Sequence, residues 1–417
     1  MSVLKSNLRK IRVLLTVCVL ASGLRGLGVR AEAAAAPGQQ AASQDPVSLE
    51  LDHFYNLEYD DAEKGLRSWL DQHPDDLRAL SYLSNVILQR EMFRRELLDA
   101  QVYGKGGEAY RDGKSNVDPQ FRAGLFSVLG KSENLANQKL AKDPRDSDAL
   151  YWMGVSHVIR AVYDLSLAKA KMDALGEAKQ ARRYHARLVE MDPNYVDAYL
   201  VIGTYDYLVG SLPWYTKFVA SMLGYHGNRE RGLEELKRAA EHGHWAQTDA
   251  KTFLAILYVR EKRYEDALRI LRELEQAYPR NFVVPQQIAR VHKSKGDWSK
   301  TAETYDSILR KYESRAAGYS KLPAAKVYYQ AGEAYARAGE EDKALDRYER
   351  AAGLGDNNAY VYRAELEAAR IERRKNRDAD ARRRFERVAR AVPNTEEGRA
   401  AARALRNLAS GPGARAD

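Results

Sequence analysis

The sequence contains a single cysteine, Cys18, among 417 residues. A chain with one cysteine holds no internal disulfide, and it offers no cysteine-based zinc site. The 12 prolines and 28 glycines are too few and too scattered for a disordered or collagen-like chain. With 45% hydrophobic and 30% charged residues, the chain has enough apolar material for a large core or for an elongated array of repeats.

Motifs of the common enzyme classes are also missing. The sequence has no GxSxG or HExxH motif. The glycines Gly104, Gly106 and Gly107 lack the spacing of a phosphate-binding loop and a preceding strand. We therefore predict no catalytic residue, no metal site and no cofactor.

Long hydrophobic runs are absent from the N-terminus, which instead has the three parts of a secretory signal. Basic residues between positions 5 and 12 precede an uncharged run over 13–24, and small residues follow at 31–33. The run is shorter than the ~17 residues that a membrane-spanning helix needs. We predict a cleaved signal peptide over 1–35 and a flexible leader over 36–45, and hence an exported protein of the periplasm or cell envelope. Retention of the run as an uncleaved anchor is the alternative.

Positive charge is concentrated at the two ends of the chain. The formal net charge is +9, and residues 1–35 carry six basic residues and one acidic residue. Residues 363–417 carry fifteen basic and nine acidic residues, so the part between these ends is slightly acidic. In the C-terminal segment the two signs alternate, as on a solvated helix rich in ion pairs. We therefore predict no nucleic-acid partner.

A pattern of small and large apolar residues recurs about every 34 residues in the second half of the chain. The first copy spans 248–281, with small residues at its eighth and twentieth positions, Ala255 and Ala267. Four copies in one register indicate a repeat protein rather than an ordinary helical bundle. The further copies begin at Phe282, Ala325 and Tyr362.

These residue types predict pairs of antiparallel helices. Small residues at two facing positions let the helices of a pair approach closely, and large apolar residues fill the remaining space. The pattern resembles the tetratricopeptide repeat over residues 43–395. The resemblance implies an all-α, right-handed superhelical solenoid of antiparallel helix pairs, with the first helix of each pair lining a concave face.

The spacing divides the repeats into two groups. Over 46–245 the pattern carries insertions and lengthened helices, with about fifteen and seventeen extra residues in the units 148–195 and 196–245. Over 246–395 the repeats are regular, and we expect a capping helix and a disordered tail over 396–417.

One segment of the stretched repeats has a second resemblance. Residues 212–236, LPWYTKFVASMLGYHGNRERGLEEL, are similar to the inclusion-body-clearance family of tetratricopeptide proteins, in which a proline-bearing apolar helix and a glycine-rich turn precede a repeat helix. The resemblance implies kinship and scaffolding, and it assigns no functional residue.

The same region is unusually apolar, since Asp206 and Lys217 are the only charged residues over 198–225. We expect burial inside the solenoid, with Trp214, Phe218 and Met222 closing one mouth of the groove. We favour this burial over membrane contact, because Asp206 and the interrupting glycines fit lipid poorly.

Two alternatives for this region use different residues. One is a peripheral membrane protein in which residues 212–224 form an exposed apolar helix. The other is an envelope hydrolase or saccharide-binding protein with a pocket near Trp214 and Tyr215.

The concave face is the predicted binding site. We expect it to be basic with some aromatic residues, and to hold an extended or helical peptide that carries acidic residues. In the alternative interpretation, many of these cations pair with glutamates of neighbouring repeats. The predicted lining residues are Arg260, Gln286, Arg290, Lys293, Tyr329, Arg337, Leu366, Arg370 and Arg373. The sequence therefore predicts an exported, non-catalytic scaffold for a protein or peptide partner, and it leaves the oligomeric state open.

Overall fold

The computed structural model describes residues 45–98, 116–355 and 358–409, and within these residues it contains helices and no β-strand. The predicted all-α fold class is confirmed. The predicted signal peptide (1–35), nearly all of the leader (36–45) and the end of the tail lie outside the described residues. Among the described helices, none combines the length and the apolar character that a membrane crossing requires.

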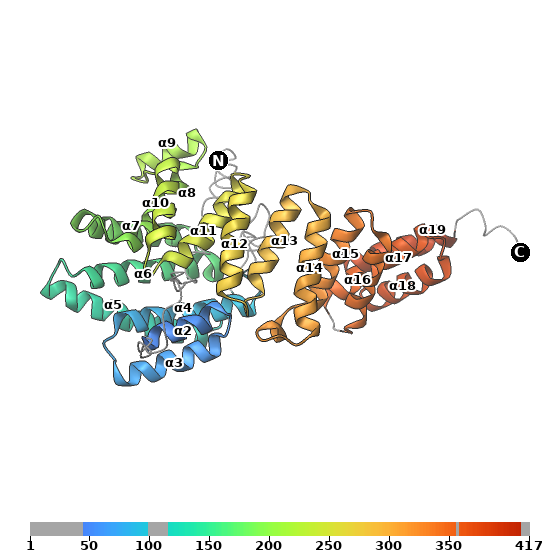
Figure 1. Cartoon of the computed structure of the whole chain (residues 1–417), viewed down its shortest axis with the longest axis horizontal. Coiled ribbons are helices and arrows are strands. Elements are labelled where there is room, and N and C mark those ends of the chain that lie inside the picture. Colours follow the sequence, from blue (N-terminus) through green and yellow to red (C-terminus); the bar gives the residue numbers. More distant parts are fainter. Residues whose placement is uncertain (1–44, 99–115, 356–357, 410–417) are drawn as a thin grey trace, which may run out of the picture. The chain divides into compact units, whose positions relative to one another are not determined.

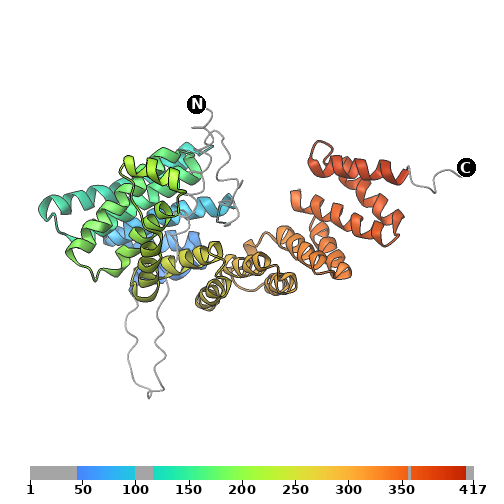
Figure 2. The ribbon, with the colours of Figure 1, turned by 90° about the horizontal axis from the view of Figure 1, so that it is seen from above.

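The chain divides into two compact units, Met1–Val283 and Val284–Asp417. The predicted change from stretched to regular repeats lies earlier, between residues 245 and 246, because it follows repeat spacing rather than compactness. Figures 1 and 2 show the helices of each unit lying beside their neighbours in chain order.

The first unit contains α2 (Pro46–Tyr55), α3 (Tyr59–Gln72), α4 (Leu77–Arg94), α5 (Pro119–Lys142), α6 (Ser147–Tyr163), α7 (Lys171–Met191), α8 (Tyr199–Gly210), α9 (Trp214–Met222), α10 (Arg229–His242), α11 (Gln247–Arg260) and α12 (Tyr264–Ala277). The later helices are α13 (Val283–Lys295), α14 (Trp298–Glu313), α15 (Ala324–Arg337), α16 (Glu341–Gly353), α17 (Ala359–Arg374), α18 (Asp378–Ala391) and α19 (Glu396–Ala409).

Aspartates begin several of these helices after a tight turn. The side chain of Asp76 accepts a hydrogen bond from the backbone N of Ala79 at 2.9 Å at the start of α4. Asp146 accepts one from the backbone N of Ala149 at 2.8 Å at the start of α6. Such caps satisfy backbone donors that the first helical turn leaves without a partner.

The predicted small residues lie where paired helices meet. Ala255 of α11 and Ala267 of α12 are almost completely buried. In α15, a Cβ added to Gly332 would lie 2.6 Å from Cε1 of Tyr348 in α16. In the regular array, the two helices of a pair therefore pack closely against each other, as in a tetratricopeptide repeat.

The stretched unit over 196–245 has an even closer helix pair, formed by α8 and α10. A Cβ added to Gly203 would lie 2.7 Å from the carbonyl O of Gly232, and one added to Gly232 would meet the backbone N of Tyr207. Backbone atoms cannot move away as a flexible side chain can. The residues inserted between α8 and α10 include the short helix α9.

The other insertion lengthens its helices, as the sequence predicts. The pair over 148–195 consists of α6 with 17 residues and α7 with 21 residues. His185 of α7 is completely buried against Gly154 of α6. Burial lowers the pKa of His185 to about 4, although its hydrogen bond to the carbonyl O of Ala181 acts in the opposite direction.

The last helix pair of the first unit contacts its first helix. Arg280, after α12, makes ion pairs with Asp52 at 2.7 Å and with Glu58 at 2.8 Å. Asn281 donates a hydrogen bond to the carbonyl O of Tyr55 at 2.7 Å, across 226 positions of sequence. Burial raises the pKa of Glu58, but hydrogen bonds from Arg280 and His53 outweigh burial and hold it below its usual value.

Several first helices of this unit are core elements rather than the lining of an open face. Fourteen of the 18 residues of α4 and ten of the 12 residues of α8 are buried. Tyr82 of α4 packs edge to face against Trp152 of α6, with ring centroids 5.5 Å apart. The sequence gives no sign of this arrangement, because the repeat pattern describes pairs and not the contacts between distant pairs.

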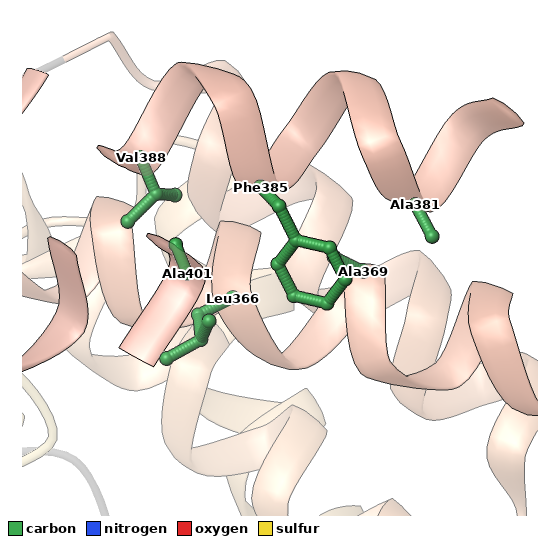
Figure 3. Close-up of a cluster of buried hydrophobic side chains, with 6 residues drawn as sticks. All are labelled: Leu366, Ala369, Ala381, Phe385, Val388 and Ala401. Atoms are coloured by element: carbon green, nitrogen blue, oxygen red, sulfur yellow. The ribbon is translucent and has the colours of Figure 1, made fainter. Parts of the chain in front are cut away.

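The second unit ends in a small apolar core that α19 covers. Figure 3 shows Phe385 of α18 directed toward Ala369 of α17, where the eighth-position alanine leaves room for the ring. Leu366, Ala381, Val388 and Ala401 complete this cluster.

Several basic residues around this core are paired with acids. Arg384 of α18 donates to Glu365 at 2.9 Å and to Glu372 at 3.0 Å, both on α17. Arg374 pairs with Glu341 of α16 at 2.7 Å. The alternating charges of this segment therefore join neighbouring helices, as expected for a helix rich in ion pairs.

The close approach of α8 and α10 leads to a first prediction. Gly232→Ala should destabilise the first unit by about 1–3 kcal/mol, because the new methyl group meets the backbone of α8. Urea unfolding followed by circular dichroism measures this change.

The control is Gly176→Ala in α7, where a Cβ meets no atom within 4 Å. This variant should gain about 0.5–1 kcal/mol, because alanine favours a helix more than glycine does. Equal effects of the two substitutions would contradict the close packing of α8 on α10.

Candidate interaction surfaces

Eight of the nine predicted lining residues lie on the first helices of the second unit. Lys293 of α13 donates to Glu333 of α15 at 2.9 Å, and α15 packs beside α17. We call the surface of these helices the first-helix face, and we define it by five residues that retain exposure. They are Lys293, Tyr329, Arg337, Arg370 and Arg373.

The first-helix face carries both signs of charge. The Lys293 and Glu333 pair joins neighbouring repeats, and Arg370 pairs with Glu367 one turn earlier at 2.5 Å. Arg337 and Arg373 are exposed, and neither makes an ion pair within the part of the chain that the structure describes. Ion pairs between and within helices thus neutralise part of the expected basic lining. The guanidinium groups of Arg337 and Arg373 remain available to bind a partner.

Three of the predicted residues are buried. Gln286 and Arg290 of α13 are 5% and 9% exposed, and Leu366 of α17 belongs to the apolar core. The repeat frame identified their helices correctly, but burial depends on neighbours that the frame does not describe.

Tyrosines gather at the centre of the first-helix face. The ring of Tyr329 lies 5.7 Å from that of Tyr348 and 5.6 Å from that of Tyr360. Burial and the nearby carboxylates of Glu333 and Glu367 raise the pKa of Tyr329 to about 12, so its phenol stays protonated at neutral pH. The guanidinium of Arg337 stacks over Trp298 at 5.7 Å, which orients this charge without neutralising it.

The ninth predicted residue, Arg260, belongs to the first unit. It is exposed at the end of α11, and its guanidinium lies 5.7 Å from the ring of Tyr207. The chain division places Arg260 in a different unit from the other eight residues.

The expected burial of the apolar segment is wrong. Trp214 is 82% exposed, and Phe218 and Met222 are also exposed, so these side chains do not close a groove. The same exposure gives no support to the predicted pocket near Trp214 and Tyr215, because an indole so open to solvent does not enclose a ligand. Their rings contact each other edge to face at 5.9 Å.

Beneath this exposed segment lies a buried charge network. Asp206 of α8 is fully buried and accepts a hydrogen bond from Nε of Arg182 in α7 at 2.9 Å. Arg231 of α10 makes a second ion pair with Asp206. Two guanidinium groups thus compensate one buried carboxylate, as burial of a charge requires.

Glu235 of α10 is a half-buried acidic residue with a perturbed pKa, and the sequence pattern did not mark it as a candidate functional residue. Glu234 and Glu235 are adjacent acidic residues of one helix, but Glu235 is turned toward Arg231 and the Asp206 network. One of its carboxylate oxygens is buried and accepts no hydrogen bond. Burial, together with the Asp206 charge, raises the pKa of Glu235 to about 7. The glycine at position 232, one turn earlier, is the only local sign of this close packing.

One group of acidic and histidine side chains has the spacing of metal ligands among the described residues. His53, Glu58 and Asp61 have ligand atoms within 4.8 Å of one another. Glu58, however, already accepts hydrogen bonds from both His53 and Arg280. The group therefore belongs to the ion-pair network that joins the ends of the first unit.

Comparisons with known proteins give one partial family match and several distantly similar structures. The sequence model of the family described as "RMD1-3: Regulator of microtubule dynamics protein 1-3" matches residues 127–292, which is less than half of the chain. No curated protein matches the chain.

Several solved structures of tetratricopeptide proteins are similar to this chain. A tetratricopeptide repeat protein from Parabacteroides merdae is 14% identical and has a TM-score of 0.30, with 76% of this chain and 95% of that chain covered. A thermophilic repeat protein of Thermus thermophilus is 17% identical, with a TM-score of 0.34 and coverage of 60% and 98%. The protein YrrB, described as having an unusual peptide-binding site, is 14% identical, with a TM-score of 0.36 and coverage of 55% and 97%. The fold assignment itself rests on the helix pairs described above.

The raised pKa of Glu235 leads to a second prediction. A carboxyl whose pKa is higher in the folded chain than in the unfolded chain lowers stability as the pH rises from about 4.5 to about 7. Glu235→Gln should therefore raise the free energy of unfolding at pH 8 by about 1–2 kcal/mol and change it little at pH 4.5.

Glu234→Gln is the matched control, because Glu234 is exposed on the same turn and, among the described residues, its ion pair is with Lys237. It should change stability by less than about 0.5 kcal/mol at both values of pH. Thermal unfolding at the two pH values measures both variants. A Glu235→Gln variant with the wild-type stability at pH 8 would show that Glu235 is not held in an unfavourable charged state.

Proposed function

We propose that the chain is a non-catalytic scaffold that binds a protein or peptide partner on the first-helix face. The supporting observation is that Arg337 and Arg373, on first helices of successive repeats, are exposed and make no ion pair with the residues that the structure describes. Stacked repeats present such a face over a longer span than a compact domain of the same size.

The chemistry of the face favours an acidic peptide. Guanidinium groups bind carboxylates through paired hydrogen bonds, and the stacking of Arg337 on Trp298 keeps its donors oriented. The partly exposed Tyr329, with Tyr360 beside it, offers an aromatic surface with low conformational entropy. An extended segment with alternating acidic and apolar residues fits both features.

The cell envelope is the proposed site of action. This part of the proposal rests on the N-terminal sequence, whose basic and apolar segments have the order of a secretory signal. Scaffolding also agrees with the sequence motifs, because the chain has neither the GxSxG nor the HExxH motif of common hydrolases.

A third prediction tests the first-helix face. Arg337→Glu combined with Arg373→Glu should reduce recovery of partner proteins from envelope extracts about tenfold, since it replaces attraction to acidic residues by repulsion. Both side chains are exposed, so the double variant should fold. Affinity capture followed by quantitative mass spectrometry measures recovery.

Arg382→Glu is the control, because Arg382 is an exposed arginine of α18, a second helix of the same unit. It changes net charge without touching the first-helix face and should leave recovery unchanged. Unchanged recovery with the double variant would show that the first-helix face does not bind the partner.

A further inference from the structure

The most unusual surface of the described structure is α9. Five of the seven exposed large hydrophobic residues belong to this helix and to the residue that follows it. They are Trp214, Phe218, Val219, Met222 and Leu223. Thr216 is the only buried residue of α9. Figure 1 shows the helix at the edge of the first unit, beyond α8 and α10.

The apolar residues of α9 cover half of its circumference. At about 100° per residue, Trp214, Phe218 and Met222 follow one another along one side, and Val219 and Leu223 extend the arc to roughly 180°. The helix therefore presents a convex apolar ridge rather than a groove. A convex apolar ridge on a short helix can enter the boundary between lipid headgroups and acyl chains.

The charges near this ridge are positive. No acidic residue occurs between Tyr207 and Arg229, whereas Lys217 lies on α9 itself. Lys179 of α7 is exposed, and its Nζ lies 3.5 Å from the carbonyl O of Leu223. Basic side chains beside an apolar ridge favour a surface that carries anionic headgroups. Trp214 and Tyr215, at the start of the helix, are the residue types that lie at the boundary between lipid and water.

The size of α9 excludes a membrane span and argues against a dimer built on this helix alone. Its nine residues cannot span a bilayer, which needs about 20. A stable dimer needs about 20–30 residues from each partner, many more than this segment supplies.

We propose that α9 inserts its apolar ridge into the interfacial region of a phospholipid surface that contains anionic lipids. The helix lies in the plane of the surface, with Lys179 and Lys217 at headgroup level. The proposal restores the membrane-contact alternative of the sequence analysis, and it does not depend on the first-helix face.

The experiment follows Trp214 itself, because the predicted signal segment is apolar and basic and could also bind vesicles. The full chain is mixed with phosphatidylcholine vesicles, with or without phosphatidylglycerol, whose acyl chains carry bromine as a quencher. The quenching of Trp214 is obtained by subtracting the tryptophan fluorescence quenching of the Trp214→Phe variant from that of the unchanged chain. We expect this quenching with the mixed vesicles and a weaker effect with phosphatidylcholine alone.

Met222→Glu should raise the lipid concentration for half-maximal quenching of Trp214 about tenfold or more, since it places a charge in the apolar ridge. Leu49→Glu is the matched control, because it adds the same charge at an exposed residue of α2 and should leave quenching unchanged. Absence of quenching of Trp214 would overturn the proposal, as would equal quenching in the Met222→Glu variant. Self-association that Met222→Glu abolishes, without quenching of Trp214, would also overturn it and would identify a second copy as the occupant.

Discussion

Close approach of paired helices at small residues is the constraint on which the rest of the structure depends. Neither helix of a pair can bury its apolar stripe alone, so the pair forms only if backbones or small side chains allow contact. Gly203 and Gly232 satisfy this condition by direct backbone packing, and Ala255 and Ala267 satisfy it in the regular array. Each further pair stacks on the apolar surface that its predecessor leaves.

In the first unit this stacking consumes nearly all of the apolar surface. The contact of Arg280 and Asn281 with the first helix joins the two ends of the unit, and α4 and α8 become core helices. The unit therefore has few exposed large apolar residues outside α9. Its buried charges are compensated locally, since Arg182 and Arg231 pair with Asp206 beneath this helix. In the second unit, ion pairs such as that of Arg384 with Glu365 join the helices, while Arg337 and Arg373 make no ion pair with any described residue. The surfaces that helix stacking leaves exposed, α9 and the first-helix face, are available for binding.

Much of the fold could be predicted because repeat spacing is a local property. Ala369 and Ala381 were placed correctly at a helix interface, and the lengthened α6 and α7 follow from the spacing of the unit 148–195. The surfaces could not be predicted equally well, because exposure depends on contacts between segments far apart in sequence. Arg290 has the frame position of a lining residue and is buried, whereas Trp214 has the composition of a core residue and is exposed. Glu235 has the same local sequence features as Glu234, and only the packing of α10 on α8 distinguishes them.

The central claim is that α8 and α10 pack against each other in the core of the first unit, whereas α9 lies outside this core. Amide hydrogen exchange of the full chain, resolved along α8, α9 and α10, measures this difference directly. The account predicts slow exchange in α8 and α10, which open only when the first unit unfolds, and exchange in α9 that is faster by orders of magnitude. Protection of α9 equal to that of its two neighbours would contradict the account.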